Sequence, residues 1–214
     1  MHRFFVKEED IQENKIYIRG DDVKHIRNVL RLNPGSEIIA CDGQGMDYSA
    51  IITGCEDSVV IADITGRGKS FSEPPVDVTL FQGVPKSDKM DFIVQKSVEL
   101  GVKTIVPVIN ERTVVRFKDK KDMGKKVERW NRIALEAAKQ CGRGIIPRVN
   151  LPVEFKAALE LGKSAGYGII PYEKHEGTGF KELAPQCGGK RIAVFIGPEG
   201  GFSDNEGEKA VSIG

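Results

Sequence analysis

Between residues 77 and 214, short apolar runs alternate with amphipathic stretches, and this alternation restricts the fold more than any other feature of the chain. The apolar runs are DVTLFQGV, TIVPVI, YGIIPYE and RIAVFIG. Stretches with helical spacing of apolar residues lie between them, at residues 87–101, 122–142 and 154–161. Strands that alternate with helices form a mostly parallel sheet. We therefore predict an α/β domain over residues 75–214.

Residues 1–70 have a different pattern, typical of a small β-barrel. Short runs rich in Ile and Val are separated by turn signals such as Asn33-Pro34-Gly35 and Asp42-Gly43. These runs are RFFV, SEIIACDG, YSAIITGC and SVVIADI. One helix is predicted among them, from Asp21 to Arg31, and the polar residues 66–77 predict the link to the second domain.

Composition excludes several classes of protein. The formal net charge is +1, so no overall field attracts nucleic acid, and any basic surface has to be a local patch. The four cysteines form no CxxC pair and the three histidines are far apart, so we predict reduced thiols and neither a metal site nor a disulfide framework. No apolar run has the length of a membrane span, and the N-terminus MHRFFVKEED lacks a signal-peptide core, so a cytoplasmic protein is expected.

Basic residues follow one face of the helix predicted at 122–142. They are Lys125, Arg129, Arg132, Lys139 and Arg143, with Glu136 among them, spaced by 4, 3, 4, 3 and 4 residues. On another face, which we predict to be buried, the same spacing relates Trp130, Ala134, Ala137 and Cys141. The basic face fits either a solvated surface with ion pairs or a stripe that contacts nucleic-acid phosphates.

Further basic side chains occur on the predicted barrel and at the ends of the α/β strands, where ligands bind in open α/β sheets. Their recurrence over both domains makes RNA or DNA the leading class of partner. The residues predicted to contact it are Arg3, His25, Arg27, Arg31, Lys86, Lys89, Arg112, Arg129 and Arg143.

A glycine-rich turn, IGPEGG at residues 196–201, follows the last apolar run and precedes a helix start. Ser203 and Glu206 have the spacing of a capping box, which satisfies helix amides internally. The turn has neither a GxxxxGK nor a GxGxxG motif, Pro198 has no N–H to donate, and Glu199 would repel a phosphate. A neutral or cationic ligand that is read by backbone groups fits better than a dinucleotide. A tight turn without a ligand is the other interpretation.

Four segments resemble, in the same order, the RsmE-type 16S ribosomal RNA uridine methyltransferases of the SPOUT superfamily. They are HIRNVLRLNPGSEI (25–38), KSDKMDFIVQKSVELGVKTIVPVINERTV (86–114), RWNRIALEAAKQCGRGIIPRV (129–149) and IGPEGGFSDNE (196–206). The resemblance implies a PUA-like RNA-binding β-barrel over residues 1–70 and a SPOUT methyltransferase domain with a C-terminal trefoil knot over residues 75–214. It also implies a homodimer that uses S-adenosylmethionine, without a metal, to form 3-methyluridine in 16S ribosomal RNA or the small ribosomal subunit.

The resemblance further implies a cofactor pocket, with IGPEGG as one wall and IIPYE, residues 169–173, as another. The residues it assigns are Ile170, Pro171, Tyr172, Glu173, Ile196, Gly197, Pro198, Glu199, Gly200, Gly201, Ser212, Ile213 and Gly214. In the family, a segment similar to Leu-Gly-x-x-Ile-Leu-Arg-x-Glu-Thr-Ala and a closing helix follow at the place where this sequence reads VSIG. We expect the knot to be incomplete in a 214-residue chain, and its S-adenosylmethionine binding, measured by calorimetry, to be weak.

Methylation of N3 of uracil requires an unpaired uridine and loss of the N3 proton, so a base, or a cation beside the uracil anion, is needed. The candidates are Glu199, Arg112 and Glu136. Glu199 would serve equally to fix the turn, and Arg112 to anchor a phosphate. Two further functions stay open at this point: a different SPOUT enzyme that acts on a ribose 2′-OH or a tRNA base, and a non-catalytic RNA-binding protein.

Overall fold

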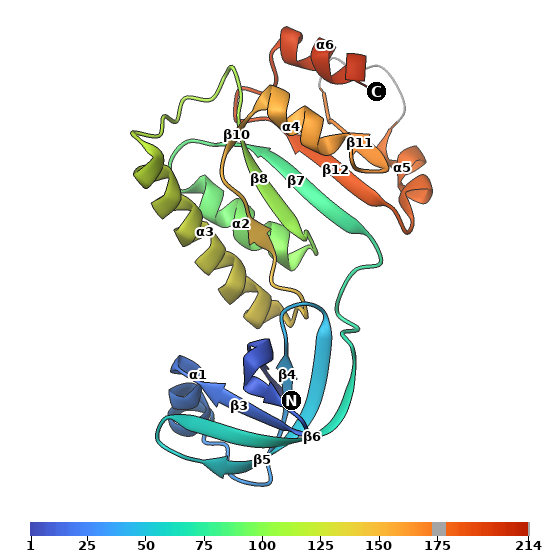
Figure 1. Cartoon of the computed structure of the whole chain (residues 1–214). Helices are drawn as coiled ribbons and strands as arrows, with labels where there is room; N and C mark the ends of the chain where they lie inside the picture. Colours follow the sequence, from blue (N-terminus) through green and yellow to red (C-terminus); the bar gives the residue numbers. More distant parts are fainter. Residues whose placement is uncertain (173–178, 214) are drawn as a thin grey trace. The chain divides into compact units, whose positions relative to one another are not determined.

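The computed structural model describes residues 1–172 and 179–213, which form two compact units (Figure 1). The first unit comprises residues 1–73 and 138–146, and the second comprises residues 74–137 and those from 147 onward. Among the described residues, no helix is long and apolar enough to cross a membrane.

The first unit is built around a six-stranded sheet with the order β1-β4-β5-β6-β3-β2. Its strands are β1 (His2–Phe5), β2 (Ile11–Gln12), β3 (Lys15–Arg19), β4 (Glu37–Cys41), β5 (Met46–Cys55) and β6 (Val59–Lys69). Only the β1–β4 pair is parallel, and the other pairs are antiparallel. Alternate residues, such as Ile16 and Ile18 of β3, are buried in one apolar core, as expected for a sheet with one covered face.

Two features of the first unit differ from the sequence-based expectation. Strands β2 and β3 were not predicted, and β6 extends through residues 66–69, which were predicted to be a link. In that extension Lys69 pairs with Met46 of β5, so cross-strand hydrogen bonds order a segment whose composition is typical of a loop. The predicted helix at 21–31 is present as α1 (Asp21–Lys24) followed by η2 (His25–Leu30), which is wound as a π-helix.

The second unit contains a parallel sheet, as the alternation of strands and helices predicted, with the order β10-β8-β7-β12-β11 and β9 beside β8. Its strands are β7 (Asp77–Gly83), β8 (Thr104–Ile109), β9 (Arg148–Val149), β10 (Val153–Glu154), β11 (Tyr167–Ile169) and β12 (Arg191–Ile196). Its helices are α2 (Lys89–Glu99), α3 (Lys120–Cys141), α4 (Phe155–Gly162), α5 (Phe180–Leu183), η3 (Ala184–Cys187) and α6 (Asp204–Ile213).

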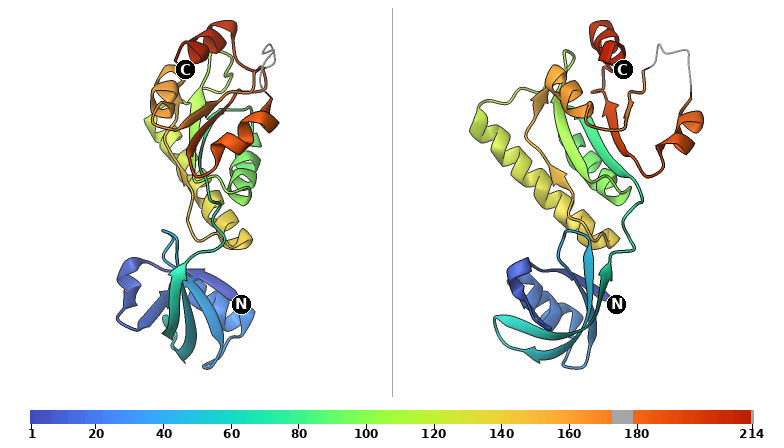
Figure 2. Two further views of the ribbon diagram at one scale, coloured as in Figure 1. Left: turned by 90° about the vertical axis from the view of Figure 1, so that its right-hand side faces the viewer. Right: turned by 45° about the vertical axis from the view of Figure 1, so that its right-hand side comes forward.

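Helices cover both faces of this sheet, with α4 on one face and α2 on the other (Figure 2). The ring of Phe81 on β7 stacks on that of Phe195 on β12, with centroids 4.5 Å apart, and α4 packs against these strands through Phe155 and Leu159. Burial on both faces explains why β8 and β12 are nearly continuous apolar runs.

Helix α3 carries the buried face predicted for it, with one correction. Trp130, Ala134 and Ala137 are buried, but Cys141 is exposed and Ala138 is fully buried in its place. The last turn of α3 belongs to the first unit, where Lys139 forms an ion pair with Asp22. Because the final helical turn packs in the first unit, Ala138 rather than Cys141 faces the core there.

Because β7, β8, β11 and β12 are parallel, their carboxyl ends lie along one edge of the sheet. The segments that follow them are residues 84–88, 110–119, 170–172 and 197–203. Open α/β sheets bind ligands at this edge. The predicted glycine-rich turn lies there, next to three other strand-end segments.

Candidate functional site

The turn after β12 has a geometry that requires glycine. The amide of Gly201 donates to the carbonyl oxygen of Pro198 at 2.8 Å, and Gly201 has a φ of +66°, which is in the left-handed region. A Cβ atom on Gly197 would lie 2.9 Å from the carbonyl carbon of Gly201. The turn thus folds back on itself so closely that a side chain at either position would strain it.

The turn packs directly on the end of β7. A Cβ atom on Gly83 would lie 2.5 Å from the nitrogen of Pro198 and 2.7 Å from Oδ1 of Asn110. The neighbouring buried Gln82 donates from Nε2 to the carbonyl oxygens of Gly83 and Gly197, at 3.0 and 3.4 Å. Sequence reasoning missed both residues, although a glycine at a strand end was a signal for close backbone approach.

Glu199, in the middle of the turn, holds the segment after β7. Its carboxylate accepts the amide N–H of Lys86 at 3.1 Å and the ammonium of Lys89 at 3.0 Å. A hydrogen bond from its own backbone amide, then those from Lys89 and Lys86, keep the pKa of the Glu199 carboxyl below its usual range, although burial opposes them. A carboxylate that is held ionised is a weak proton acceptor at neutral pH, so this geometry favours the fixing role over the role of a general base.

The segment after β8 reaches the same turn. Arg112 donates from Nη1 to the carbonyl oxygen of Gly200 at 2.6 Å, and its side chain is otherwise exposed. Asn205 at the start of α6 donates to Oε1 of Glu111 at 2.7 Å. The predicted capping box of α6 is confirmed, because the amide of Ser203 donates to Oε2 of Glu206 and the amide of Glu206 donates to Oγ of Ser203.

Residues 170–172 form the neighbouring wall. Strands β11 and β12 are adjacent and parallel, with Ile169 opposite Val194, so the segments that follow them start side by side. The hydroxyl of Tyr172 donates to Oδ1 of Asp204 at 2.9 Å, which ties this wall to the start of α6. A Cβ atom on Gly207 would lie 3.0 Å from Cζ of Tyr172, so the ring lies flush against α6.

Of the remaining predicted cofactor residues, Glu173 and Gly214 lie outside the described residues. Ser212 is exposed on α6, where its hydroxyl donates to the carbonyl oxygen of Lys209, and Ile213 is the last residue of that helix. The structure thus brings together the two predicted walls at 170–172 and 196–201.

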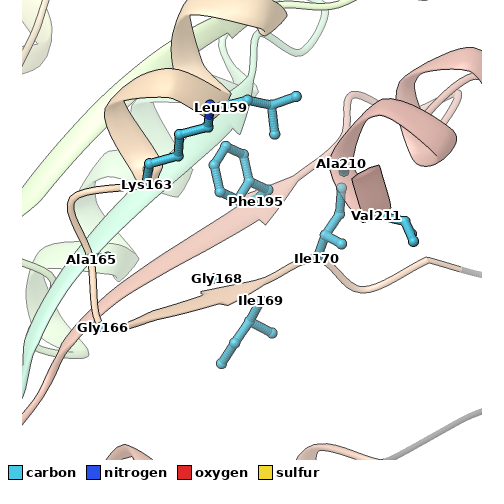
Figure 3. Close-up of a pocket in the computed structure, with 11 residues that line it drawn as sticks. Leu159, Lys163, Ala165, Gly166, Gly168, Ile169, Ile170, Phe195, Ala210 and Val211 are labelled. Atoms are coloured by element: carbon cyan, nitrogen blue, oxygen red, sulfur yellow. The ribbon is translucent and has the colours of Figure 1, made fainter. Parts of the chain in front are cut away.

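A pocket of about 420 Å³ opens beside the second wall (Figure 3). Its lining is mostly apolar and comes from α4, β11, β12 and α6, with Leu159, Ile170, Phe195 and Val211 around one space and Lys163 as the charged member. Ile170 is the predicted cofactor residue that lines it. The volume lies in the range of small-molecule sites, about 300–1,000 Å³.

Two of the residues predicted to contact RNA have mostly buried side chains in the first unit. The guanidinium of Arg3, 11% exposed, donates twice to the carboxylate of Asp47, and that of Arg143, 4% exposed, pairs with Glu73 at 2.7 Å. Glu73 also accepts the amides of Gly144 and Ile145. The spacing of basic residues in the sequence gave no indication of these carboxylates, which are distant in the chain. We therefore leave both arginines out of the RNA surface proposed below.

The other basic candidates have exposed side chains. In the first unit they lie on or directly after η2: His25, Arg27, which pairs with Asp57, and Arg31, whose φ of +53° is uncommon for a residue with a side chain. Functional segments often hold such strained conformations, and π-helical turns are frequent there. In the second unit they are Lys86, Lys89, Arg112 and Arg129, the last of which pairs with Asp91 on α2. Glu136 is exposed on α3.

Titratable residues give no sign of a metal centre. Within residues 1–172 and 179–213, no three His, Cys, Asp or Glu side chains are grouped as metal ligands would be. The four cysteines are free: Cys41 and Cys187 are buried, Cys55 is half-buried and Cys141 is exposed. Burial raises the pKa of the Cys41 thiol to about 12, so that group is inert at neutral pH.

Comparisons with known proteins agree with this architecture. Residues 72–214 match the model of the RNA methyltransferase domain, and residues 18–64 match that of the RNA methyltransferase PUA domain. The chain is 32% identical to the ribosomal RNA small subunit methyltransferase E of Bacillus subtilis, over 98% of this chain and 84% of that protein. It therefore combines a PUA-like domain with a methyltransferase domain of α/β fold.

Solved structures are similar over the whole chain. The ribosomal RNA small subunit methyltransferase E from Neisseria gonorrhoeae, bound to S-adenosylmethionine, has a TM-score of 0.82 at 31% identity, over 100% of this chain and 86% of that chain. A putative methyltransferase from Legionella pneumophila, in complex with the same cofactor, has a TM-score of 0.81 at 29% identity, over 99% of this chain and 86% of that chain.

Proposed function

Because the chain belongs to the ribosomal RNA small subunit methyltransferase E family, we propose that it transfers a methyl group from S-adenosylmethionine to N3 of a uridine in small-subunit ribosomal RNA. The observation that carries the proposal is the glycine-rich turn, which lies at the edge of the sheet where open α/β folds bind ligands and is held by the segments that follow β7 and β8. Family membership supports methyl transfer as the reaction, and the position of the turn supports it as the proposed cofactor site.

The residues proposed to hold the cofactor are those of the two walls, Ile170–Tyr172 and Ile196–Gly201. The fit is favourable in three respects: the pocket beside Ile170 is apolar and of small-molecule size, the glycines allow close approach to the backbone, and the edge lacks a phosphate-binding motif. Asp204, exposed at the start of α6, adds negative charge near the walls, which suits a ligand that carries a sulfonium, whereas the charge of Glu199 is paired with Lys89. When bound, S-adenosylmethionine supplies an electrophilic methyl group.

Arg112 is the side chain that we propose to act on the uridine. It extends from the segment after β8 to the glycine-rich turn, and its guanidinium is exposed apart from the contact with Gly200. A guanidinium placed beside uracil stabilises the anion that forms when N3 loses its proton. Glu136 is exposed on α3, and we propose that it faces the uridine from the neighbouring subunit of a homodimer with the knotted SPOUT topology.

RNA binding is proposed for exposed basic residues on both units. They are His25, Arg27, Arg31, Lys86, Lys89, Arg112 and Arg129. Each cation that contacts a phosphate releases counterions, so the logarithm of the binding constant falls with the logarithm of salt by roughly 0.7–0.9 per contact. We propose a cytoplasmic location, because the proposed substrate is ribosomal.

The proposed role of Glu199 gives a first prediction. Glu199→Gln keeps an acceptor for the amide of Lys86 and loses the charge that pairs with Lys89. Because Glu199 fixes the turn and does not act as the general base, we expect kcat for methyl transfer to fall by less than about tenfold. Loss of a general base would instead cost about 10²–10⁴-fold. Steady-state kinetics with Glu208→Gln, an exposed residue of α6, as control checks this, and a loss above 100-fold assigns the proton transfer to Glu199.

The proposed reaction is tested with the protein expressed from its own gene. Small subunits from a Bacillus subtilis strain that lacks its own relative are incubated with S-adenosylmethionine carrying a deuterated methyl group, and the rRNA is digested for nucleoside mass spectrometry. We expect the label in 3-methyluridine alone, at one position. Label in a 2′-O-methylated nucleoside identifies a different SPOUT activity, and RNA binding without label identifies a non-catalytic protein.

A further inference from the structure

Glu206 is a buried acid beside the glycine-rich turn. It is 2% exposed, and among the described residues it is the only carboxylate in the buried class. It lies in the first turn of α6, where the helix dipole favours negative charge. We propose that Glu206 is a positioning residue that fixes Arg112 and the glycine-rich turn relative to each other, an inference that rests on the proposed methyl transfer for its functional part.

Three N–H groups from two segments converge on this carboxylate. Oε1 accepts Nδ2 of Asn110 and the amide of Glu111, both at 3.0 Å, and Oε2 accepts the amide of Ser203, also at 3.0 Å. Asn110 and Glu111 follow β8, whereas Ser203 follows β12. One side chain therefore joins the segment that carries Arg112 to the segment that carries Gly200.

The two segments belong to strands that are not neighbours. In the sheet, β7 lies between β8 and β12, so the link made by Glu206 passes over the end of β7. Gly83 ends β7, and its missing side chain leaves the space in which Asn110 and Pro198 approach each other. Glu206 and Gly83 therefore act together. The carboxylate joins the segments that follow β8 and β12, and the glycine leaves room for them to approach each other.

Arg112 depends on this link. It follows directly after Glu111, whose amide is held by Glu206 and whose carboxylate is held by Asn205. From there its guanidinium spans to Gly200 at 2.6 Å. Release of the Glu111 amide would free the backbone from which Arg112 extends, while Arg112 itself would keep its charge and its chemistry.

A carboxylate suits this place and an amide does not. All three contacts are N–H donors, and a carboxylate accepts with both oxygens. In Glu206→Gln one oxygen becomes an NH₂ group. If its remaining oxygen keeps Ser203, the NH₂ group faces the donors at Asn110 and Glu111. Asn110 adapts by flipping, because its Oδ1 is buried without a hydrogen-bond partner, but the amide of Glu111 has no such remedy.

The experiment compares Glu206→Gln with Glu208→Gln, which makes the same change at an exposed position of the same helix. For Glu206→Gln we expect kcat for methyl transfer to small subunits to fall about 10–100-fold, as for the loss of one charge-assisted hydrogen bond, with KM for S-adenosylmethionine changed less than threefold. In an Arg112→Lys background the same substitution should cost less than threefold, because its effect acts through Arg112. Glu208→Gln should match the wild type.

Hydrogen–deuterium exchange of the same variants supplies a readout that does not need activity. The amides of residues 110–113 should exchange faster in Glu206→Gln than in the wild type, and at the wild-type rate in Glu208→Gln. Unchanged exchange in Glu206→Gln, or losses in kcat that multiply with those of Arg112→Lys, overturns the proposal. If the wild type transfers no methyl group, the proposed function fails, whereas faster exchange at 110–113 still supports the link through Glu206.

Discussion

Replacing Gly83 with alanine should lower the rate of methyl transfer about 100-fold and destabilise the second unit. The new Cβ would lie 2.5 Å from the nitrogen of Pro198, so backbone rather than a flexible side chain has to move. Overpacking of this kind costs about 1–3 kcal/mol of unfolding free energy. A displacement of about 1 Å at a reacting site costs about 10²-fold in rate. Kinetics and denaturant unfolding of the same preparation measure both effects.

The matched control is Gly68→Ala on β6 of the first unit. A Cβ there meets nothing within 4 Å, and the residue is also a strand glycine without a positive φ. Its kinetics should equal those of the wild type. A Gly83→Ala enzyme with full activity would contradict the close packing of the glycine-rich turn on β7.

Removing the carboxylate of Glu73 should destabilise the first unit by about 3–5 kcal/mol, the usual cost of removing one partner of a buried ion pair. In Glu73→Ala the guanidinium of Arg143, 4% exposed, loses hydrogen bonds from Nε and Nη2 to Glu73, and the amides of Gly144 and Ile145 lose their acceptor. Urea unfolding measures the loss. Asp63→Ala, which breaks an exposed ion pair with Lys15 in the same unit, should have a much smaller effect.

Acid should remove the contribution of Glu73 in a defined direction. Burial acts to raise the pKa of its carboxyl, but hydrogen bonds from Arg143 and the amides of Ile145 and Gly144 outweigh burial and hold the pKa below the ordinary 4.5. A folded-state pKa below the unfolded one means that the stabilisation is fully present above pH 4.5 and is lost as pH falls through the folded value. The wild type should therefore lose more stability than Glu73→Ala between pH 5 and pH 3, and parallel loss would contradict the pairing.

Periodicity predicted the four longer strands of the second unit and the helices between them, but not the short elements β9, β10, α5 and η3. The apolar runs correspond to β7, β8, β11 and β12, and their parallel order follows from the helices between them. The position of the turn at residues 196–201 and the capping box of Ser203 and Glu206 were predicted too, because both depend on residues close in sequence. Sequence patterns over a few residues therefore predicted structure that forms between residues close in the chain.

Partners far apart in sequence account for what was missed. Glu206 appeared as a capping residue, but its contacts with Asn110 and Glu111, about 95 residues away, depend on strand order. Arg143 appeared to belong to a basic helical face, and its burial against Glu73 depends on a segment 70 residues earlier. Strand β3 was missed because KIYIR is short and flanked by polar residues, although β6 supplies its pairing.

A crystal structure of the protein expressed from its own gene, with S-adenosylmethionine bound, tests the central claim most directly. We predict that the cofactor contacts the backbone of residues 196–201 and the side chain of Ile170, and that Arg112 lies on the side of the turn that faces the methyl group. A cofactor bound away from both walls, with the turn still packed on Gly83, would contradict the claim and leave that turn a purely structural element.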